Sequence, residues 1–246
     1  MAKRFLLFCL LLVFVLPLAA QQQRLMNMPT FDEKRLHFGF TLGVNSGDFV
    51  VANNNSRLYS DVAGIYPGFS VGMVSNLRLG TDFDLRFLPG LSLVRRPLTF
   101  NEDIYVLTGT GAGSAMVLSE NPTVLPFTPI FLDFPLHIKY KARRINNGRP
   151  YLTTGPAFRY DLNTSQIAVG DKNVHLVDIT KGSFYYEIGT GWDTYFTFFR
   201  FSVEAKVSLG LGSILKSNPP ADQLPDYHLS MDALRSNLFS LLFHFE

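Results

Sequence analysis

Residues 36–45 alternate strictly between two kinds of side chain, and this alternation constrains the fold more than any other feature of the sequence. The even positions, from Leu36 to Val44, are apolar and bulky, whereas the odd positions, from His37 to Asn45, are small or polar. Successive side chains of a β-strand point to opposite faces, so a period of two predicts a strand with one apolar face.

Seven later segments repeat this pattern, which gives eight candidate strands. In each segment, bulky apolar residues on one parity lie opposite small, polar or charged residues on the other. The seven segments are residues 68–73, 82–93, 132–141, 152–162, 184–193, 199–210 and 239–246. A chain of this kind is all-β, and the fold class then depends on what the bulky face meets.

A closed transmembrane barrel accounts for the two faces better than a soluble sandwich. In a sandwich the bulky face would enter a dry core, whereas in a membrane barrel it meets lipid and the polar face lines the interior. Almost all strand glycines lie on the polar face, and the narrow interior of an eight-stranded barrel needs small residues. These glycines are Gly39, Gly43, Gly68, Gly72, Gly90, Gly155, Gly189, Gly191 and Gly210.

The connections between the candidate strands alternate in length, as they do in outer-membrane barrels. The short gaps are near residues 78–81, 142–149 and 193–198, and the long gaps are roughly 46–65, 95–128, 163–182 and 212–236. Aromatic residues, which favour the membrane interface, lie at the short-turn end of the apolar face: Tyr140, Trp192, Phe199 and Phe245. The sequence therefore predicts an all-β fold, an eight-stranded antiparallel up-and-down transmembrane β-barrel with long extracellular loops and short periplasmic turns. The barrel must be closed, because lipid offers no hydrogen-bond partner to the backbone groups of a sheet edge.

The N-terminus has the features of a secretory signal peptide. Lys3 and Arg4 form a basic region, an apolar run follows, and small residues end at Ala20, where we expect cleavage. The alternative is a membrane anchor, but this run is shorter than the roughly 20 apolar residues that a spanning helix needs. We expect a signal peptide at 1–20, a polar periplasmic lead-in at 21–34 that could bind a partner, and an outer-membrane barrel at 35–246.

Composition excludes several classes of partner and site. The chain has 22 Lys and Arg against 20 Asp and Glu, and removal of Lys3 and Arg4 with the signal peptide leaves 20 of each, so we expect no nucleic-acid partner. The single cysteine, Cys9, lies in the predicted signal peptide. The mature chain can therefore form no disulfide and no cysteine-ligated metal site.

Signals for catalysis are weak. The five histidines show no H-E-x-x-H or other metal-binding spacing, and the sequence has no G-x-S-x-G motif. We predict a protein that is not an enzyme and that has no cofactor. A lipid-modifying enzyme with a dispersed set of Ser, His and acidic residues stays open as an alternative.

Charged side chains gather on the polar face, which a barrel would enclose. An unpaired charge in a narrow interior costs on the order of several kcal/mol, so these groups must pair or stay hydrated. We expect a structural network of salt bridges; a conducting pore is the alternative, although a selective pore favours rings of one sign. The predicted network comprises Asp82, Asp84, Arg86, Asp133, His137, Lys139, Arg159, Asp161, Glu187, Arg200, Glu204 and Lys206, with Lys141 and Asp193 on the same parity.

Several strings resemble outer-membrane barrels of the Bacteroidota, and specifically the PorT family. They are residues 36–45, 67–72, 85–91, 133–141, 147–152 and 158–162. The resemblance implies a component of the type IX secretion system, which exports folded cargo across the outer membrane, and it brings no catalytic residues. Because eight strands leave no channel for a folded protein, the implied role is accessory, with outer-membrane lipid and other type IX secretion components as partners.

A second function stays open beside the secretion role. Related barrels of unknown role share the quoted strings, so a stand-alone barrel for adhesion or membrane integrity is the alternative. The C-terminus also departs from the usual outer-membrane ending, because Glu246 follows the well-placed Phe243 and Phe245.

Overall fold

The structure is a computed structural model that describes residues 26–53, 60–62, 67–94, 98–100, 104–107, 115–119, 123–125, 129–162, 166–168, 175–178, 180–215 and 231–246. The predicted signal peptide at 1–20 and the first residues of the lead-in lie outside these ranges, so the cleavage site stays a prediction. Within the described ranges, no helix is long and apolar enough to cross a membrane.

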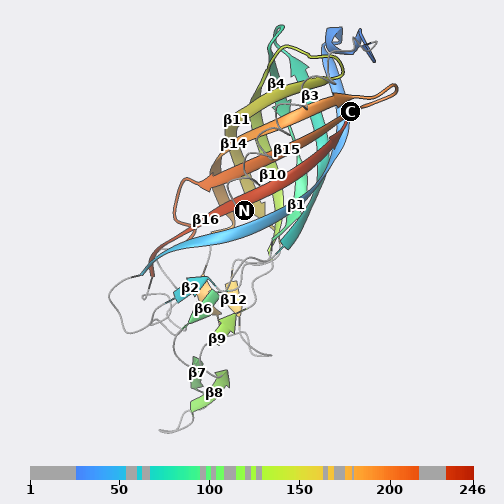
Figure 1. Cartoon of the computed structure of the whole chain (residues 1–246). Coiled ribbons are helices and arrows are strands. Elements are labelled where there is room, and N and C mark those ends of the chain that lie inside the picture. The colour runs from blue at the N-terminus through green and yellow to red at the C-terminus, as the bar shows by residue number, and fades with distance from the viewer. Residues whose placement is uncertain are drawn as a thin grey trace, which may run out of the picture.

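Eight antiparallel strands close into a ring (Figure 1). β4 and β5 both pair with β3 on one side and β10 on the other, so they count as two parts of one strand of the ring. In chain order the ring contains β1 (Leu36–Asn53), β3 (Pro67–Arg78), β4 (Phe83–Phe87), β5 (Gly90–Leu93), β10 (Ile130–Lys141), β11 (Gly148–Asp161), β14 (Gly182–Tyr195), β15 (Arg200–Gly210) and β16 (Met231–Phe245). Each strand pairs with the next along the chain, which confirms the predicted up-and-down barrel.

The ring closes between its first and last strands. β1 pairs with β3 on one side, where Phe40 lies opposite Met73, and with β16 on the other, where Phe40 lies opposite Phe245. β1 therefore has a sheet partner along both sides, which the hydrocarbon core of a membrane requires.

The division between β4 and β5 was not predicted, although Leu88 and Pro89 interrupt the alternation within residues 82–93. Its cause is Pro89, which has no backbone N–H to donate to a neighbouring strand. The N–H of Leu88 still bonds to the carbonyl oxygen of Pro135, the residue opposite it, at 3.3 Å, but Pro135 has no N–H to return a second bond. The side-chain alternation continues through the break, because Arg86 and Leu88 are both buried.

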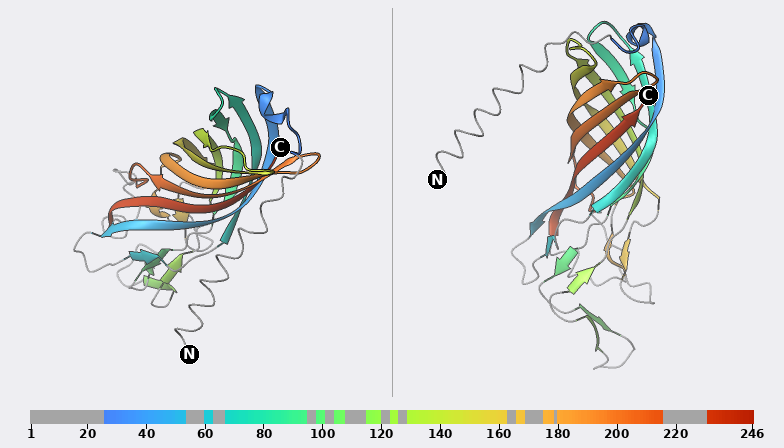
Figure 2. Two further views of the ribbon diagram at one scale, coloured as in Figure 1. Left: turned by 45° about the horizontal axis from the view of Figure 1, so that its top comes forward. Right: turned by 45° about the vertical axis from the view of Figure 1, so that its right-hand side comes forward.

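The two ends of the ring differ, as Figure 2 shows. The short turns lie at one end with the C-terminus and the 3-10 helix η2 (Phe31–Glu33). The other end carries short strands within the long loops, namely β2 (Ser60–Val62), β6 (Leu98–Phe100), β7 (Ile104–Leu107), β8 (Ala115–Ser119), β9 (Thr123–Leu125), β12 (Gln166–Ala168) and β13 (His175–Asp178). β1 and β16 extend toward these loops beyond their predicted bounds, because they pair with each other as far as Ala52 opposite Ala233.

The two parities face opposite surroundings. Phe38, Ile188 and Phe239 are 67%, 52% and 53% exposed on the outside of the ring, whereas Arg86 and Glu204 are fully buried inside it. A soluble sandwich would bury the large apolar residues instead. The burial pattern therefore confirms the barrel.

Small residues on the inner parity make room for large ones. A Cβ atom added to Gly191 would come 2.4 Å from the ring carbon Cζ of Tyr151 and 2.7 Å from the carbonyl oxygen of Val203. Tyr151 is only 2% exposed, so its ring has little room to move. Gly191 is thus required by the close approach of Tyr151 to β14.

We expect the substitution Gly191→Ala to lower the free energy of unfolding by about 1–3 kcal/mol, the usual cost of overpacking a filled interior. Circular dichroism during urea titration in detergent micelles measures this change. The matched control is Gly80→Ala, because a Cβ at Gly80 would have no atom within 4 Å. Equal stability of the two variants would contradict the tight packing of Tyr151.

Candidate functional site: the charged barrel interior and its closed end

The interior of the ring is filled with charged side chains from most of its strands. β4 contributes Asp84 and Arg86, and β10 contributes His137, Lys139 and Lys141. β11 contributes Arg159 and Asp161, β14 contributes Glu187 and Asp193, and β15 contributes Arg200, Glu204 and Lys206. Each of these side chains on β4, β10, β11, β14 and β15 is less than 9% exposed. Asp133 of β10 is slightly more exposed and accepts a hydrogen bond from the hydroxyl of Ser92 at 2.6 Å.

Asp82 is the exception among the predicted network residues. It lies exposed in the short turn before β4. Its backbone carbonyl accepts a hydrogen bond from the N–H of Lys141 at 2.7 Å. Asp82 therefore lies outside the interior network, because it precedes the first residue of β4 and alternation fixes a face only within a strand.

One group of contacts, the Glu187 cluster, lies in the part of the interior nearer the long loops. The Glu187 carboxylate is 2.8 Å from His137 Nε2, 2.7 Å from Arg159 Nη2 and 2.7 Å from Lys206 Nζ. It also accepts a hydrogen bond from the hydroxyl of Ser208 at 2.7 Å. These donors come from three strands, so the cluster ties β10, β11 and β15 to β14 across the interior.

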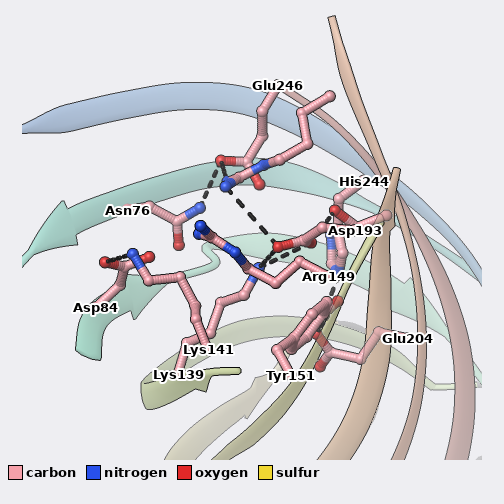
Figure 3. Close-up of polar contacts among 12 residues, drawn as sticks. Asn76, Asp84, Lys139, Lys141, Arg149, Tyr151, Asp193, Glu204, His244 and Glu246 are labelled. Carbon is pink, nitrogen blue, oxygen red and sulfur yellow. Dashed lines mark hydrogen bonds and ion pairs between the residues drawn. The ribbon is translucent and has the colours of Figure 1, made fainter. Parts of the chain in front are cut away.

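A second group, the Glu204 cluster, lies nearer the short turns (Figure 3). The Glu204 carboxylate accepts hydrogen bonds from Arg86 Nη1 at 2.8 Å and from the hydroxyl of Tyr151 at 2.9 Å. The hydroxyl of Thr153 donates at 3.1 Å, and His244 Nε2 lies 3.3 Å away. Several donors surrounding one buried carboxylate replace the water that it loses on folding.

Further ion pairs complete the interior on the short-turn side of Glu204. Lys139 Nζ lies 2.8 Å from Asp193 and 3.6 Å from the centre of the Tyr151 ring. Lys141 Nζ lies 2.7 Å from Asp84. Figure 3 shows Lys141 reaching Asp84 on one side, while Tyr151 lies on the other.

The last residue of the chain joins this network, which was not predicted. The Glu246 carboxylate accepts hydrogen bonds from Asn76 and Arg200, and Arg86 Nη2 lies 3.6 Å from it. Its backbone also pairs with Arg200, through N–H to O distances of 2.7 and 2.9 Å. The signal was present in the sequence, because Glu246 shares the polar parity of His244.

Little space is left between these side chains. A cavity of about 40 Å³ lies beside the Glu187 cluster, lined in part by Thr41, Asn45 and Ser70. This is room for on the order of three water molecules. The described interior is a packed network rather than a wide channel.

Residues 26–34, here termed the N-terminal lid, fold across the short-turn end of the barrel. Phe31 is 7% exposed, and its ring centre lies 4.3 Å from that of His37 and 6.2 Å from that of Tyr195. The guanidinium of Arg200 lies 4.9 Å from the same ring. The lead-in was predicted to be polar and available for binding, but its described part packs onto the barrel through an aromatic anchor.

Asp32 fixes the lid to the neighbouring turn. Its carboxylate lies 3.0 Å from Arg149 Nη2 and 3.9 Å from Arg144 Nη1. The hydroxyl of Tyr195 donates to it at 2.9 Å. The alternation of side chains could not predict these lid contacts, because Phe31 and Asp32 precede the first strand.

The interior offers no evident catalytic or metal centre. Among the residues that the structure describes, no three His, Cys, Asp or Glu side chains are arranged to hold a metal ion. The two His–carboxylate pairs, His137 with Glu187 and His244 with Glu204, are at most 1% exposed. His137 Nε2 is hydrogen-bonded to the Glu187 carboxylate, and His244 lies beside the Glu204 carboxylate, so the visible contribution of both histidines is packing and hydrogen bonding within the two clusters.

The sequence match to known families identifies the class of protein. Residues 19–216 match the family described as outer membrane protein beta-barrel domain. The chain belongs to this family. An outer-membrane β-barrel protein of this kind lies in the outer membrane, with its short turns toward the periplasm and its long loops outside.

Solved outer-membrane barrels resemble this fold. Neisserial surface protein A is 13% identical, with 86% of this chain and 98% of that chain covered and a TM-score of 0.42. Ail of Yersinia pestis is 7% identical over 86% and 99% of the two chains, with a TM-score of 0.38. The protease OmpT of Escherichia coli is 10% identical over 91% and 98%, also with a TM-score of 0.38. The likeness concerns the fold alone, and no curated protein matches the sequence.

We expect Glu204→Ala to destabilise this outer-membrane β-barrel protein by about 3–5 kcal/mol, because the substitution leaves Arg86 buried without its closest carboxylate. Fluorescence of Trp192, the single tryptophan, during urea unfolding in lipid vesicles measures the change. Asp82→Ala in the exposed turn is the control and should change stability by less than about 0.5 kcal/mol. Similar losses in both variants would argue against a structural network.

Proposed function

We propose that this outer-membrane β-barrel protein is a non-catalytic accessory component of type IX protein secretion, as its resemblance to the PorT family implies. One observation carries the proposal. The sequence segments that resemble the PorT family also supply the charged side chains that fill the barrel interior. Residues 133–141 supply Asp133, His137, Lys139 and Lys141, and residues 85–91 supply Arg86. What resembles the family is thus the framework of the barrel as well as its lipid-facing side.

The packing of the interior supports an accessory role rather than a translocating one. A cavity of about 40 Å³ admits a few water molecules, whereas a folded cargo protein would need an opening tens of ångströms wide. Opening the ring that far would expose unpaired strand edges to lipid. Any contribution to secretion must therefore use the outer surfaces of the barrel.

The charge network has a structural role in this proposal. Each buried carboxylate of the Glu187 and Glu204 clusters has donors from other strands, so the network holds the strands in register around a narrow interior. Both clusters mix the two signs of charge, which suits pairing better than selective conduction. A rigid barrel would present its loops, turns and lipid-facing side to a larger translocon.

The proposal is tested by deleting the gene in the native host and measuring the export of type IX cargo. We expect cargo that carries the C-terminal export signal to accumulate inside the cell, and a plasmid copy of the wild-type gene to restore its export. Purification of the complemented protein in mild detergent should recover other type IX secretion components.

Two results would contradict the secretion role. Normal cargo export with altered surface adhesion or envelope integrity would favour the stand-alone barrel. Normal export with a changed lipid A structure would favour the lipid-modifying enzyme. A copy carrying Asp82→Ala is the matched control for complementation, because Asp82 lies outside the interior network.

A further inference from the structure

The short-turn end of the barrel contains a cationic pocket that the barrel builds from its own residues. The Arg144 guanidinium stacks on the Tyr195 ring at 3.7 Å, and Arg144 Nε donates to the carbonyl oxygen of Asn146 at 2.8 Å. Arg149 lies on β11 with its guanidinium 5.8 Å from the same ring. Both guanidinium groups thus lie near the Tyr195 ring, Arg144 from the turn and Arg149 from β11, and both also contact the lid.

The chain fills this pocket with two consecutive residues of its own lid. Asp32 supplies the carboxylate for Arg149, Arg144 and the Tyr195 hydroxyl. Phe31 lies edge-on to the Tyr195 ring and covers Arg200. The pocket therefore holds an aromatic side chain followed directly by a carboxylate in this structure.

Asp32 does not satisfy the pocket completely. Two guanidinium groups share this one carboxylate, and Arg149 Nε is buried without a hydrogen-bond partner. The Asp32 side chain is still 22% exposed, so water reaches the pair. An ion pair that solvent reaches is weak enough to exchange.

The lid is attached in a way that permits release. Its described residues form no ladder with a barrel strand, since the pairing of β1 begins at Leu36. Besides Phe31 and Asp32, Asn27 fixes it by hydrogen bonds with Asn147, Arg144 and the carbonyl oxygen of Tyr195. The lid could leave the pocket without breaking any strand pairing of the ring.

We propose that the periplasmic mouth is a docking site for a segment of a partner protein in which one turn of 3-10 helix presents an aromatic residue followed by a carboxylate, and that the N-terminal lid occupies this site as an exchangeable stand-in. Such a segment would place its carboxylate between Arg144 and Arg149 and its ring against Tyr195. This site does not depend on the secretion role, because it follows from the pocket and the lid alone.

The test measures binding of a fluorescent synthetic peptide of residues 26–33 to the full mature chain in detergent micelles. The double substitution Phe31→Ala and Asp32→Ala removes the two lid side chains that occupy the pocket, and this variant is here called the released variant. We expect fluorescence anisotropy to show at least tenfold tighter binding to the released variant than to the wild type, in which the lid competes. A peptide in which Asp32 is replaced by Asn should bind the released variant at least tenfold more weakly.

A matched pair of arginine variants locates the site. In the released background, Arg149→Gln should weaken binding of the peptide at least tenfold. Arg143→Gln should leave binding unchanged, because Arg143 is an exposed neighbour in the same turn and contributes no contact to the pocket described above. Equal effects of the two substitutions would indicate binding by general charge attraction and would overturn the proposal.

The other possible results of the binding experiment also test the proposal. If the released variant does not fold, as judged by Trp192 fluorescence, Asp32→Asn alone should still tighten peptide binding relative to the wild type. Equal binding to the wild type and to the lid variants, or binding to neither, would overturn the proposal. The binding experiment does not measure cargo export. A failure of the docking proposal can therefore be distinguished from a failure of the proposed secretion role.

Discussion

Hydrocarbon leaves no hydrogen-bonding partner for an exposed backbone, and the architecture of this protein depends on that constraint. A sheet that crosses the membrane must pair its last strand with its first, as β16 does with β1. With eight strands the closed ring is narrow, so one parity of every strand is enclosed in a small volume. The bulky parity is left outside, where lipid takes the place of a protein core.

The enclosed parity then decides the character of the interior. Its charges can be removed from water only if they find partners, and the Glu187 and Glu204 clusters bring donors from several strands to each buried carboxylate. Glu246 and the N-terminal lid extend the same logic to the short-turn end, where Arg200 lies between the lid ring and the terminal carboxylate. A filled interior leaves the loops, the lipid-facing side and the periplasmic mouth as the surfaces through which the protein can act.

Alternation in the sequence predicts which side of the barrel wall each strand residue faces. It does not predict which other residue that side chain contacts. Alternation is a local property of a strand, so the outward side of Phe38 and the inward side of Arg86 could be predicted without the rest of the chain. Which carboxylate meets Arg86 depends on the ring, because Glu204 and Glu246 come from strands far away in the sequence. Asp82 is exposed because it lies in the turn before β4 begins at Phe83.

Segments without alternation were also beyond prediction. The end of β1 from residue 48 onward does not alternate, and its extension follows from pairing with β16. The lid has no period, and only the barrel's own Tyr195, Arg144 and Arg149 show why Phe31 and Asp32 matter.

The central claim is that the bulky parity faces lipid, and quenching of Trp192 by brominated phospholipids tests it most directly. Trp192 is the single tryptophan and is 48% exposed on the outside of the ring. In vesicles, brominated acyl chains should quench its fluorescence strongly, and the same should hold when Trp192→Phe and Phe239→Trp move the probe to another strand of the ring. Fluorescence that brominated lipids leave unchanged at both positions would contradict the account, because the aromatic residues would then lie in a core away from the membrane.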